Sequence, residues 1–154
     1  MISLQDRSDV QDLIAQYVYG MDTGDADYVV GLFAPEADCI DVTGKTWDAR
    51  SGGVAGFTKQ FLTTPYKRIG QHYFQVVKFE KVDGVTYRVR SFWSFYIWKN
   101  GEQELPILRM IGLYTHTVTH ANGQWLISHM KIEPWRAGDE ANSLLVTDPV
   151  HARL

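Results

Sequence analysis

Two titratable residues, far apart in the sequence, have the types and surroundings that proton-transfer chemistry requires. His72 lies in the segment GQHYFQVV, where alternate positions place it on one face of a strand with Phe74 and Val76. A histidine at the mouth of an apolar cavity can accept a proton near neutral pH, provided that another group fixes its tautomer. Asp22 is a candidate for that group, because it stands at the expected end of a helix, where a carboxylate is otherwise disfavoured by roughly 0.3–1 kcal/mol. On the residues alone, a purely structural role for His72 is the alternative.

The other histidines and the single cysteine predict neither a metal site nor a disulfide. His116 and His120 lie four residues apart in an expected strand, roughly 13 Å, too far to share one ion without a bend. His129 and His151 have no carboxylate or cysteine at ligand spacing, and Cys39 is the only cysteine. Glycine-rich phosphate loops, dinucleotide fingerprints and the G-x-S-x-G and H-E-x-x-H motifs are also missing. We therefore expect catalysis without a metal or an organic cofactor.

Helices are expected in the first half of the chain, and the first of them positions Asp22. Apolar residues recur at helical spacing over residues 4–20, which predicts one buried face. A second helix is expected over residues 26–33, before a proline stop, and a third over residues 51–62. The expected N-caps are Asp6 or Ser8 for the first helix, Asp25 for the second and Ser51 for the third. Because Asp25 suits the second helix as a cap, Asp22 is free for another role.

Strands are expected in the second half. A short strand, ADCIDV, precedes the third helix, and four longer segments rich in β-branched and aromatic residues are separated by the turn signals VDG, KNGEQE and HANG. The four segments are residues 68–82, 84–99, 105–120 and 123–135. Helices followed by antiparallel strands indicate an α+β fold in which the helices cover one face of a curved sheet.

One strand segment, SFWSFYIW (Ser91–Trp98), is apolar at both even and odd positions. A sheet with one solvated face alternates apolar and polar residues, so both faces of this strand are expected to be covered. We expect the helices to cover one face and a second copy of the chain the other, in a homodimer or homotrimer. Large aromatics scattered on a free surface are the alternative.

Composition and charge bound the class of protein. With 154 residues, 45% of them apolar and 21% charged, we expect a single domain over residues 1–154, with residues 137–154 as a tail or flap. A net charge of −3 without a long basic run argues against nucleic acid as a partner. The N-terminal segment lacks the layout of a signal peptide, and no apolar run reaches about 18 residues. A cytoplasmic protein without membrane contact is expected.

A family resemblance rests on the stretches DRSDVQDLIAQYVYGMDTGDADYVVGLFAPEADC, QHYFQVVKFE and GQWLISHMKIEPW, with a glycine-containing third helix between the first two. With them the chain resembles the SnoaL-like branch of the nuclear-transport-factor-2 (NTF2) superfamily over roughly residues 6–136. The resemblance implies a cone-shaped NTF2-like barrel, in which three N-terminal helices pack in a strongly bent, mainly antiparallel sheet. The chain is similar to the cofactor-free lyases of this branch, such as hexachlorocyclohexane dehydrochlorinase, scytalone dehydratase and bile-acid 7α-dehydratase.

The resemblance also implies roles for residues. In those lyases an aspartate at the end of the first helix pairs with a histidine after the third helix, and Asp22 and His72 match these positions. Tyr17 matches a tyrosine of the bile-acid dehydratase, and Arg136 matches its late arginine. The dehydrochlorinase has a lysine in place of Tyr17, so a tyrosine favours an oxygen-bearing substrate. Five residues turn an ideal helix by about 500°, so Tyr17 and Asp22 are expected to face one cavity only if the helix ends near Gly20.

These residues predict a cofactor-independent lyase acting on a small, hydrophobic, ring-bearing substrate. Neutral His72 would remove an acidic C–H proton while Asp22 orients its ring. Tyr17, with Arg136 or Arg109, would hydrogen-bond the departing hydroxyl or the developing enolate. Dehydration is the expected reaction, and retro-aldol C–C cleavage or cyclisation is open to the same groups. The residues expected to line the pocket are Asp41, Trp47, Phe57, Phe61, Trp93, Phe95, Arg109 and Ile111.

Two other functions are open from the sequence. Related ketosteroid isomerases use a first-helix tyrosine and a first-strand aspartate, which Tyr17 and Asp41 would match, and His72 would then have no role. The dioxygenase β subunits and small binding modules that share the implied fold are not catalytic. The isomerase interpretation leaves Asp22 unexplained, and the non-catalytic one gives no function to a pair formed by Asp22 and His72.

Overall fold

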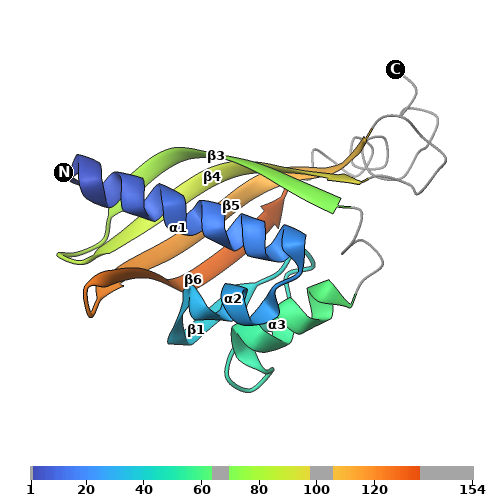
Figure 1. The fold of residues 1–154 in the computed structure, drawn as a ribbon, viewed down its shortest axis with the longest axis horizontal. Helices are drawn as coiled ribbons and strands as arrows, with labels where there is room; N and C mark the ends of the chain where they lie inside the picture. Colours follow the sequence, from blue (N-terminus) through green and yellow to red (C-terminus); the bar gives the residue numbers. More distant parts are fainter. Residues whose placement is uncertain (1, 64–69, 98–105, 136–154) are drawn as a thin grey trace.

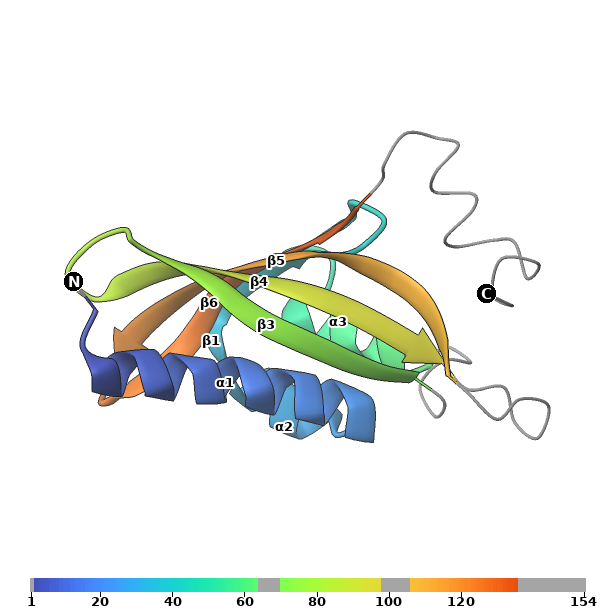
Figure 2. The ribbon, with the colours of Figure 1, turned by 90° about the horizontal axis from the view of Figure 1, so that it is seen from above.

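Helices and sheet form two layers in the computed structural model, which describes residues 2–63, 70–97 and 106–135. Within these ranges, α1 (Leu4–Thr23), α2 (Ala26–Gly31) and α3 (Gly53–Leu62) lie on one side of a curved sheet (Figures 1 and 2). α1 runs along the long strands, and Figure 2 shows it beneath them. None of the helices in the described ranges is long and apolar enough to cross a membrane.

The sheet is mainly antiparallel and confirms the expected α+β fold. Its strands, in the order in which they are hydrogen-bonded, are β2 (Thr46–Trp47), β1 (Phe33–Ile40), β6 (Gln124–Pro134), β5 (Ile107–Ala121), β4 (Thr86–Ile97) and β3 (Gly70–Lys81). The four expected long strands form antiparallel neighbours, and β1 joins β6 in parallel. β2 and β3 are the edges, so the sheet curves around the helices without closing.

Strand β1 is longer than the expected segment ADCIDV, and strand β2 was not predicted. β1 begins at Phe33 because the chain already pairs there with β6, where Ile127 N donates to Leu32 O at 3.0 Å. β2 is a two-residue strand whose Trp47 pairs with Cys39 of β1. So short a strand has no alternation of apolar and polar residues to reveal it.

α1 begins at Leu4 as expected, but its expected N-cap and its expected end near Gly20 were wrong. Ser3 is the N-cap, because its hydroxyl oxygen accepts from the backbone N–H of Asp6 at 3.0 Å, and Asp6 and Ser8 lie inside the helix. The helix also continues past Gly20 and ends with Gly24 in the left-handed conformation, φ 81°. Gly20 instead allows close packing of α1 on α2, since a Cβ there would lie 2.6 Å from a methyl carbon of Val29.

The cap expected for α2 is confirmed, and the cap expected for α3 was wrong. Asp25 accepts from the backbone N–H of Tyr28 at 3.0 Å and so begins α2, which ends at Gly31. α3 begins at Gly53 after Gly52, whose φ of 93° favours a residue without a side chain. The Ser51 hydroxyl is not available as a cap, because it hydrogen-bonds within the preceding turn at Asp48.

Alternation of burial along β4 separates an inner from an outer face of the sheet. Its odd-numbered residues are buried against the helices, whereas Phe92 on the outer face is 44% exposed. Trp135, 49% exposed, packs edge-on against Phe92 at 5.4 Å between ring centroids, and Tyr73 packs similarly against Tyr96 at 5.5 Å. The helices therefore cover one face of β4, and its other face carries exposed aromatic side chains.

We predict that a second copy of the chain covers this outer aromatic face. Phe92→Arg would place a charge in the centre of that interface, so we expect the wild type to be a dimer or trimer and the variant to be a monomer. Light scattering after size exclusion measures both masses. Val85→Arg is the control, because Val85 is also exposed but lies in the turn between β3 and β4. A monomeric wild type at micromolar concentration contradicts the prediction.

Candidate active site

Asp22 and His72 contact each other through both oxygens of the carboxylate. Asp22 Oδ1 lies 2.5 Å from Nδ1 of the His72 ring, and Asp22 Oδ2 accepts the backbone N–H of His72 at 2.8 Å. The two side chains are only 17% and 9% exposed. One residue is in the last turn of α1 and the other at the start of edge strand β3. This pairing compensates for placing a carboxylate at a helix C-terminus.

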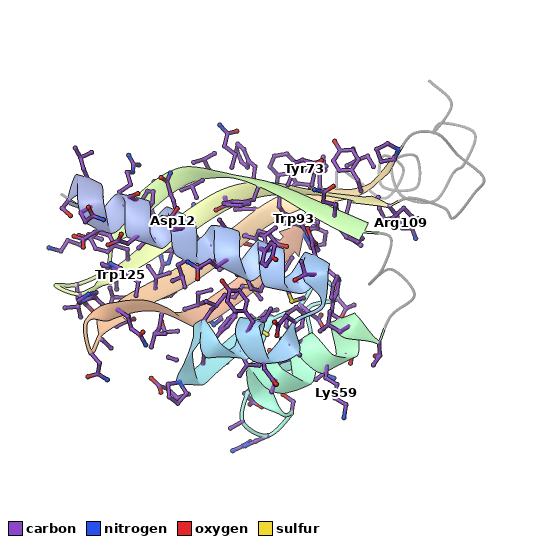
Figure 3. The ribbon with its side chains drawn as sticks, in the orientation of Figure 1. Asp12, Lys59, Tyr73, Trp93, Arg109 and Trp125 are labelled. Carbon is purple, nitrogen blue, oxygen red and sulfur yellow. The ribbon has the colours of Figure 1, made fainter. Side chains whose placement is uncertain are left out.

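The geometry of the pair fixes the tautomer of the ring. A carboxylate accepts only, so the neutral imidazole carries its hydrogen on Nδ1, and Nε2 keeps a lone pair. Aromatic rings surround the imidazole: the centroid of Phe95 is 4.4 Å away, that of Phe61 5.8 Å and that of Trp93 6.4 Å. Trp93 is a buried residue of β4, and in the view of Figure 3 it is seen near the C-terminal half of α1. Nε2 is thus an oriented base in mostly apolar surroundings.

Tyr17 lies deeper in the molecule than the pair. Its side chain is 2% exposed, and its ring packs against Phe33 at 5.8 Å, Tyr114 at 6.2 Å and His116 at 5.8 Å between centroids. Burial raises the pKa of Tyr17 well above its ordinary value, and the charges of Tyr114, Cys39 and Asp22 act in the same direction. Tyr17 is therefore a protonated hydrogen-bond donor.

The helix does not need to unwind between Tyr17 and Asp22, contrary to the sequence-based expectation. The two side chains leave α1 in different directions because they meet different parts of a broad sheet. Asp22 reaches edge strand β3, whereas Tyr17 packs against residues of β1 and β5. Trp93 lies on the inner face between these strands. Its ring centroid is 6.4 Å from that of His72 and 5.3 Å from that of Tyr114, which in turn packs against Tyr17.

Asp41 closes a turn. Its Oδ1 accepts from the backbone and hydroxyl of Thr43, at 2.8 and 2.6 Å, and from the backbone of Lys45, at 3.2 Å, while Oδ2 accepts from Trp47 Nε1 at 2.8 Å. Burial alone would raise the pKa of Asp41, but these hydrogen bonds outweigh it and lower the pKa below its ordinary value. Both oxygens are occupied, so Asp41 has little capacity to act as a base.

Replacing Asp41 by asparagine is expected to lower the free energy of unfolding by about 1–3 kcal/mol, because the amide nitrogen cannot accept the buried Trp47 N–H. Urea unfolding at neutral pH measures the change. Asp38→Asn is a control on β1, because Asp38 is partly exposed. Equal stability of the Asp41 variant and the wild type would show that the turn does not depend on this carboxylate.

Comparison with known proteins decides the family. The model of the SnoaL-like domain matches residues 3–131. The chain belongs to the SnoaL-like domain family. This confirms the resemblance found in the sequence, while no curated protein sequence matches the chain.

Solved structures share the fold of this SnoaL-like protein at low sequence identity. A candidate scytalone dehydratase from Novosphingobium aromaticivorans has a TM-score of 0.70 and 16% identity, covering 86% of each chain. LinA, a type 2 hexachlorocyclohexane dehydrochlorinase, has a TM-score of 0.68 and 18% identity, covering 88% of this chain and 92% of its own. A protein of unknown function with a cystatin-like fold from Nostoc punctiforme has a TM-score of 0.72 and 14% identity, covering 90% and 98%.

The structure brings some of the residues expected in the pocket of this SnoaL-like protein to His72 and moves others away. Phe61, Trp93 and Phe95 surround the imidazole. Phe57 and Trp47 pack on each other at 6.5 Å near the turn of Asp41. Ile111 was misplaced: it pairs with Ser94 of β4, on the outer face, because side chains of paired residues share a face.

The two arginines have different outcomes. Arg109 lies near the start of β5, where the pairing with β4 shifts between Phe95 and Tyr96, at the end of the sheet that carries His72 (Figure 3). Its role stays a prediction. Arg136 and the tail over residues 137–154 lie outside the described residues.

Two features of the inner and outer faces were missed. His129 has no carboxylate at ligand spacing in the sequence, but its Nδ1 lies 2.5 Å from Oδ1 of Asp38, since β1 and β6 pair in parallel. This second pair is 34% and 41% exposed. Tyr114 and His116 are buried on the inner face, which the alternation with threonine in YTHTVT could have indicated. The described residues contain no group of three metal ligands.

Proposed function

We propose that this SnoaL-like protein is a small-molecule enzyme, a cofactor-independent lyase whose base is His72. The observation that carries the proposal is the partly buried contact between Asp22 and His72, which leaves Nε2 of an oriented imidazole free to accept a proton. The aromatic rings of Phe61, Trp93 and Phe95 around the imidazole suit a ring-bearing substrate. The family and the dehydratase and dehydrochlorinase among the similar folds support an elimination.

The proposed reaction is the loss of water from a β-hydroxy carbonyl compound. His72 Nε2 takes the proton on the carbon between the carbonyl and the hydroxyl-bearing carbon, and the electron pair of the C–H bond forms an enolate. The Asp22 carboxylate stabilises the resulting imidazolium. The enolate then expels the β-hydroxyl, which takes the proton from His72 and leaves as water. Tyr17 donates a hydrogen bond to a substrate oxygen, and Arg109 is a second candidate donor.

The isomerase alternative is disfavoured by the surroundings of Asp41. A general base needs a free lone pair within reach of the substrate, whereas four hydrogen bonds occupy the Asp41 carboxylate. The non-catalytic alternative gives no reason to bury a histidine with its tautomer fixed. Activity measurements separate these alternatives.

The test uses 4-hydroxy-4-phenyl-2-butanone, because its products distinguish the reactions. Dehydration gives benzylideneacetone and water, whereas retro-aldol cleavage gives benzaldehyde and acetone. We expect purified wild type and Asp41→Asn to produce the enone at similar rates. Chromatography of the products measures these rates. Further aromatic β-hydroxy ketones and phenolic diols are tested in parallel. If the wild type isomerises a β,γ-unsaturated ketone and Asp41→Asn does not, the isomerase is favoured. If the protein binds the tested compounds without converting them, a binding module is favoured.

A further inference from the structure

Trp93 carries a buried indole N–H without an acceptor in the described part of the chain. Its side chain is 4% exposed, and Nε1 has no hydrogen-bond partner among the described residues. Buried donors are almost always satisfied, because an unpaired one destabilises the folded protein. A phenylalanine would supply the same apolar wall without this cost. Since an indole can only donate, the partner that suits Trp93 is an acceptor.

Gly112 fixes the position of this N–H over the sheet. Trp93 of β4 pairs with Gly112 of β5, and a Cβ on Gly112 would lie 2.9 Å from Trp93 Nε1. Only a residue without a side chain lets the indole lie so close to the backbone of β5. The ring also stacks on Tyr114, with centroids 5.3 Å apart at an interplanar angle of 26°. The indole is therefore held across β5 with Nε1 over Gly112.

The indole is also a neighbour of the proposed base. The ring centroids of Trp93 and His72 are 6.4 Å apart. In the proposed reaction the leaving hydroxyl must lie within reach of His72 Nε2, because this nitrogen returns the proton to it. A donor that holds the hydroxyl oxygen must therefore adjoin His72 and have no acceptor of its own. Trp93 meets both conditions within the described ranges.

We propose that Trp93 is a catalytic hydrogen-bond donor to the leaving hydroxyl, which lies between Trp93 Nε1 and His72 Nε2. This inference rests on the proposed lyase function and adds a residue that acts on its second step. As the C–O bond breaks, its electron pair stays on oxygen, and the enolate forms the new C=C bond and restores the carbonyl. The oxygen takes the proton from the His72 imidazolium and leaves as water. The Trp93 N–H keeps its proton and stabilises the charge that develops on oxygen.

Two rates separate the role of Trp93 from that of His72. The first is the loss of water from 4-hydroxy-4-phenyl-2-butanone. The second is the exchange of hydrogen for deuterium at the same carbon of 4-phenyl-2-butanone in heavy water, because this ketone has no leaving group. We expect Trp93→Phe to lower the ratio of elimination to exchange by roughly 10- to 100-fold, the effect of one hydrogen bond to a charged group.

Trp125→Phe is the matched control, because it makes the same chemical change near the turn between β5 and β6. Trp125 packs against Tyr87 at 5.8 Å and His120 at 5.0 Å, and Figure 3 shows it far along the sheet from Trp93. This variant should keep the wild-type ratio. An unchanged ratio in Trp93→Phe overturns the inference. An equal fall of both rates also overturns it and would assign Trp93 to the wall of the pocket alone.

Binding to the wild type tests the same contact without turnover and without a variant that has to fold. 1-Phenylethanol carries a benzylic hydroxyl like that of the substrate, and ethylbenzene lacks it. We expect 1-phenylethanol to move the NMR resonance of the Trp93 indole N–H downfield, and ethylbenzene not to do so. A resonance that responds equally to both compounds, or to neither, overturns the inference. Exchange that survives in His72→Ala contradicts the proposed function instead, so the two failures are distinguishable.

Discussion

Replacing His72 by alanine is expected to lower the rate of elimination by roughly 10²–10⁴-fold, the usual contribution of a general base. The variant removes the imidazole of His72. On the described inner face of the sheet, it is the only imidazole with Nδ1 held by a carboxylate and Nε2 left free for proton transfer. It leaves the aromatic rings of Phe61 and Phe95 in place, so substrate binding should change much less than the rate. Steady-state kinetics with the ketone substrate should therefore show a fall in kcat with little change in KM.

Asp22→Asn tests the orientation of the ring in the same assay. The asparagine oxygen can still accept the backbone N–H of His72, so the start of β3 keeps one of its two contacts with α1. An amide nitrogen facing Nδ1 would favour the opposite tautomer and occupy the ring in the wrong sense. We expect the rate of elimination to fall by at least about 10²-fold. Raising the substrate concentration should restore neither the activity nor the tautomer.

The outer face of the sheet supplies a matched control for both variants. His129 and Asp38 form a pair with the same 2.5 Å contact between Nδ1 and Oδ1, but on the partly exposed outer face. His129→Ala and Asp38→Asn should leave the rate of elimination unchanged. Equal losses at the two pairs would mean that the variants act through stability, and an active His72→Ala would remove this residue from the mechanism.

Acidification is expected to destabilise the wild type more than His116→Leu, by about 2–3 kcal/mol between pH 6.5 and pH 4.5. Burial lowers the pKa of His116 from 6.5 to about 3, and the neighbouring charge of His129 adds to it. In this pH range the unfolded chain binds a proton at His116 and the folded protein does not. The free energy of unfolding therefore falls by about 1.4 kcal/mol for each pH unit below 6.5, until the pH nears the lowered pKa.

Urea unfolding at pH 7 and at pH 4.5 measures this difference. His116→Leu should be at least as stable as the wild type at pH 7, because both ring nitrogens are buried without a hydrogen-bond partner in the described structure. His120→Leu is the control on the same strand, since His120 is exposed. Identical pH dependence of the wild type and His116→Leu would show that the folded protein binds a proton at His116 as readily as the unfolded chain does.

Local patterns in the sequence predicted the elements but not all of their ends. Helical spacing over residues 4–20 and the turn signals between the long strands correctly predicted α1 and the antiparallel order of β3 to β6. The cap of α1 was placed wrongly because Ser3, Asp6 and Ser8 are all suitable residue types, and only the path of the chain selects among them.

The candidate site could be predicted where the family resemblance and the residue types agreed. Asp22 stood out as a carboxylate in an unfavourable place, and His72 as a histidine among apolar neighbours, before any contact between them was known. Asp41 was over-interpreted because a carboxylate after a strand looks the same in sequence whether it acts as a base or closes a turn. Its four hydrogen bonds are made within six residues, yet they depend on how the turn bends.

The sequence by itself determined the α+β class, the family and the two residues of the pair, because these depend on periodicity and residue type. Only the tertiary structure decided which side chains meet. The parallel pairing of β1 with β6 brought Asp38 to His129, and the register of β4 with β5 put Tyr114 beside Trp93 and turned Ile111 outward. Register is set by packing between segments far apart in the chain, and a shift of one residue would reverse every one of these faces.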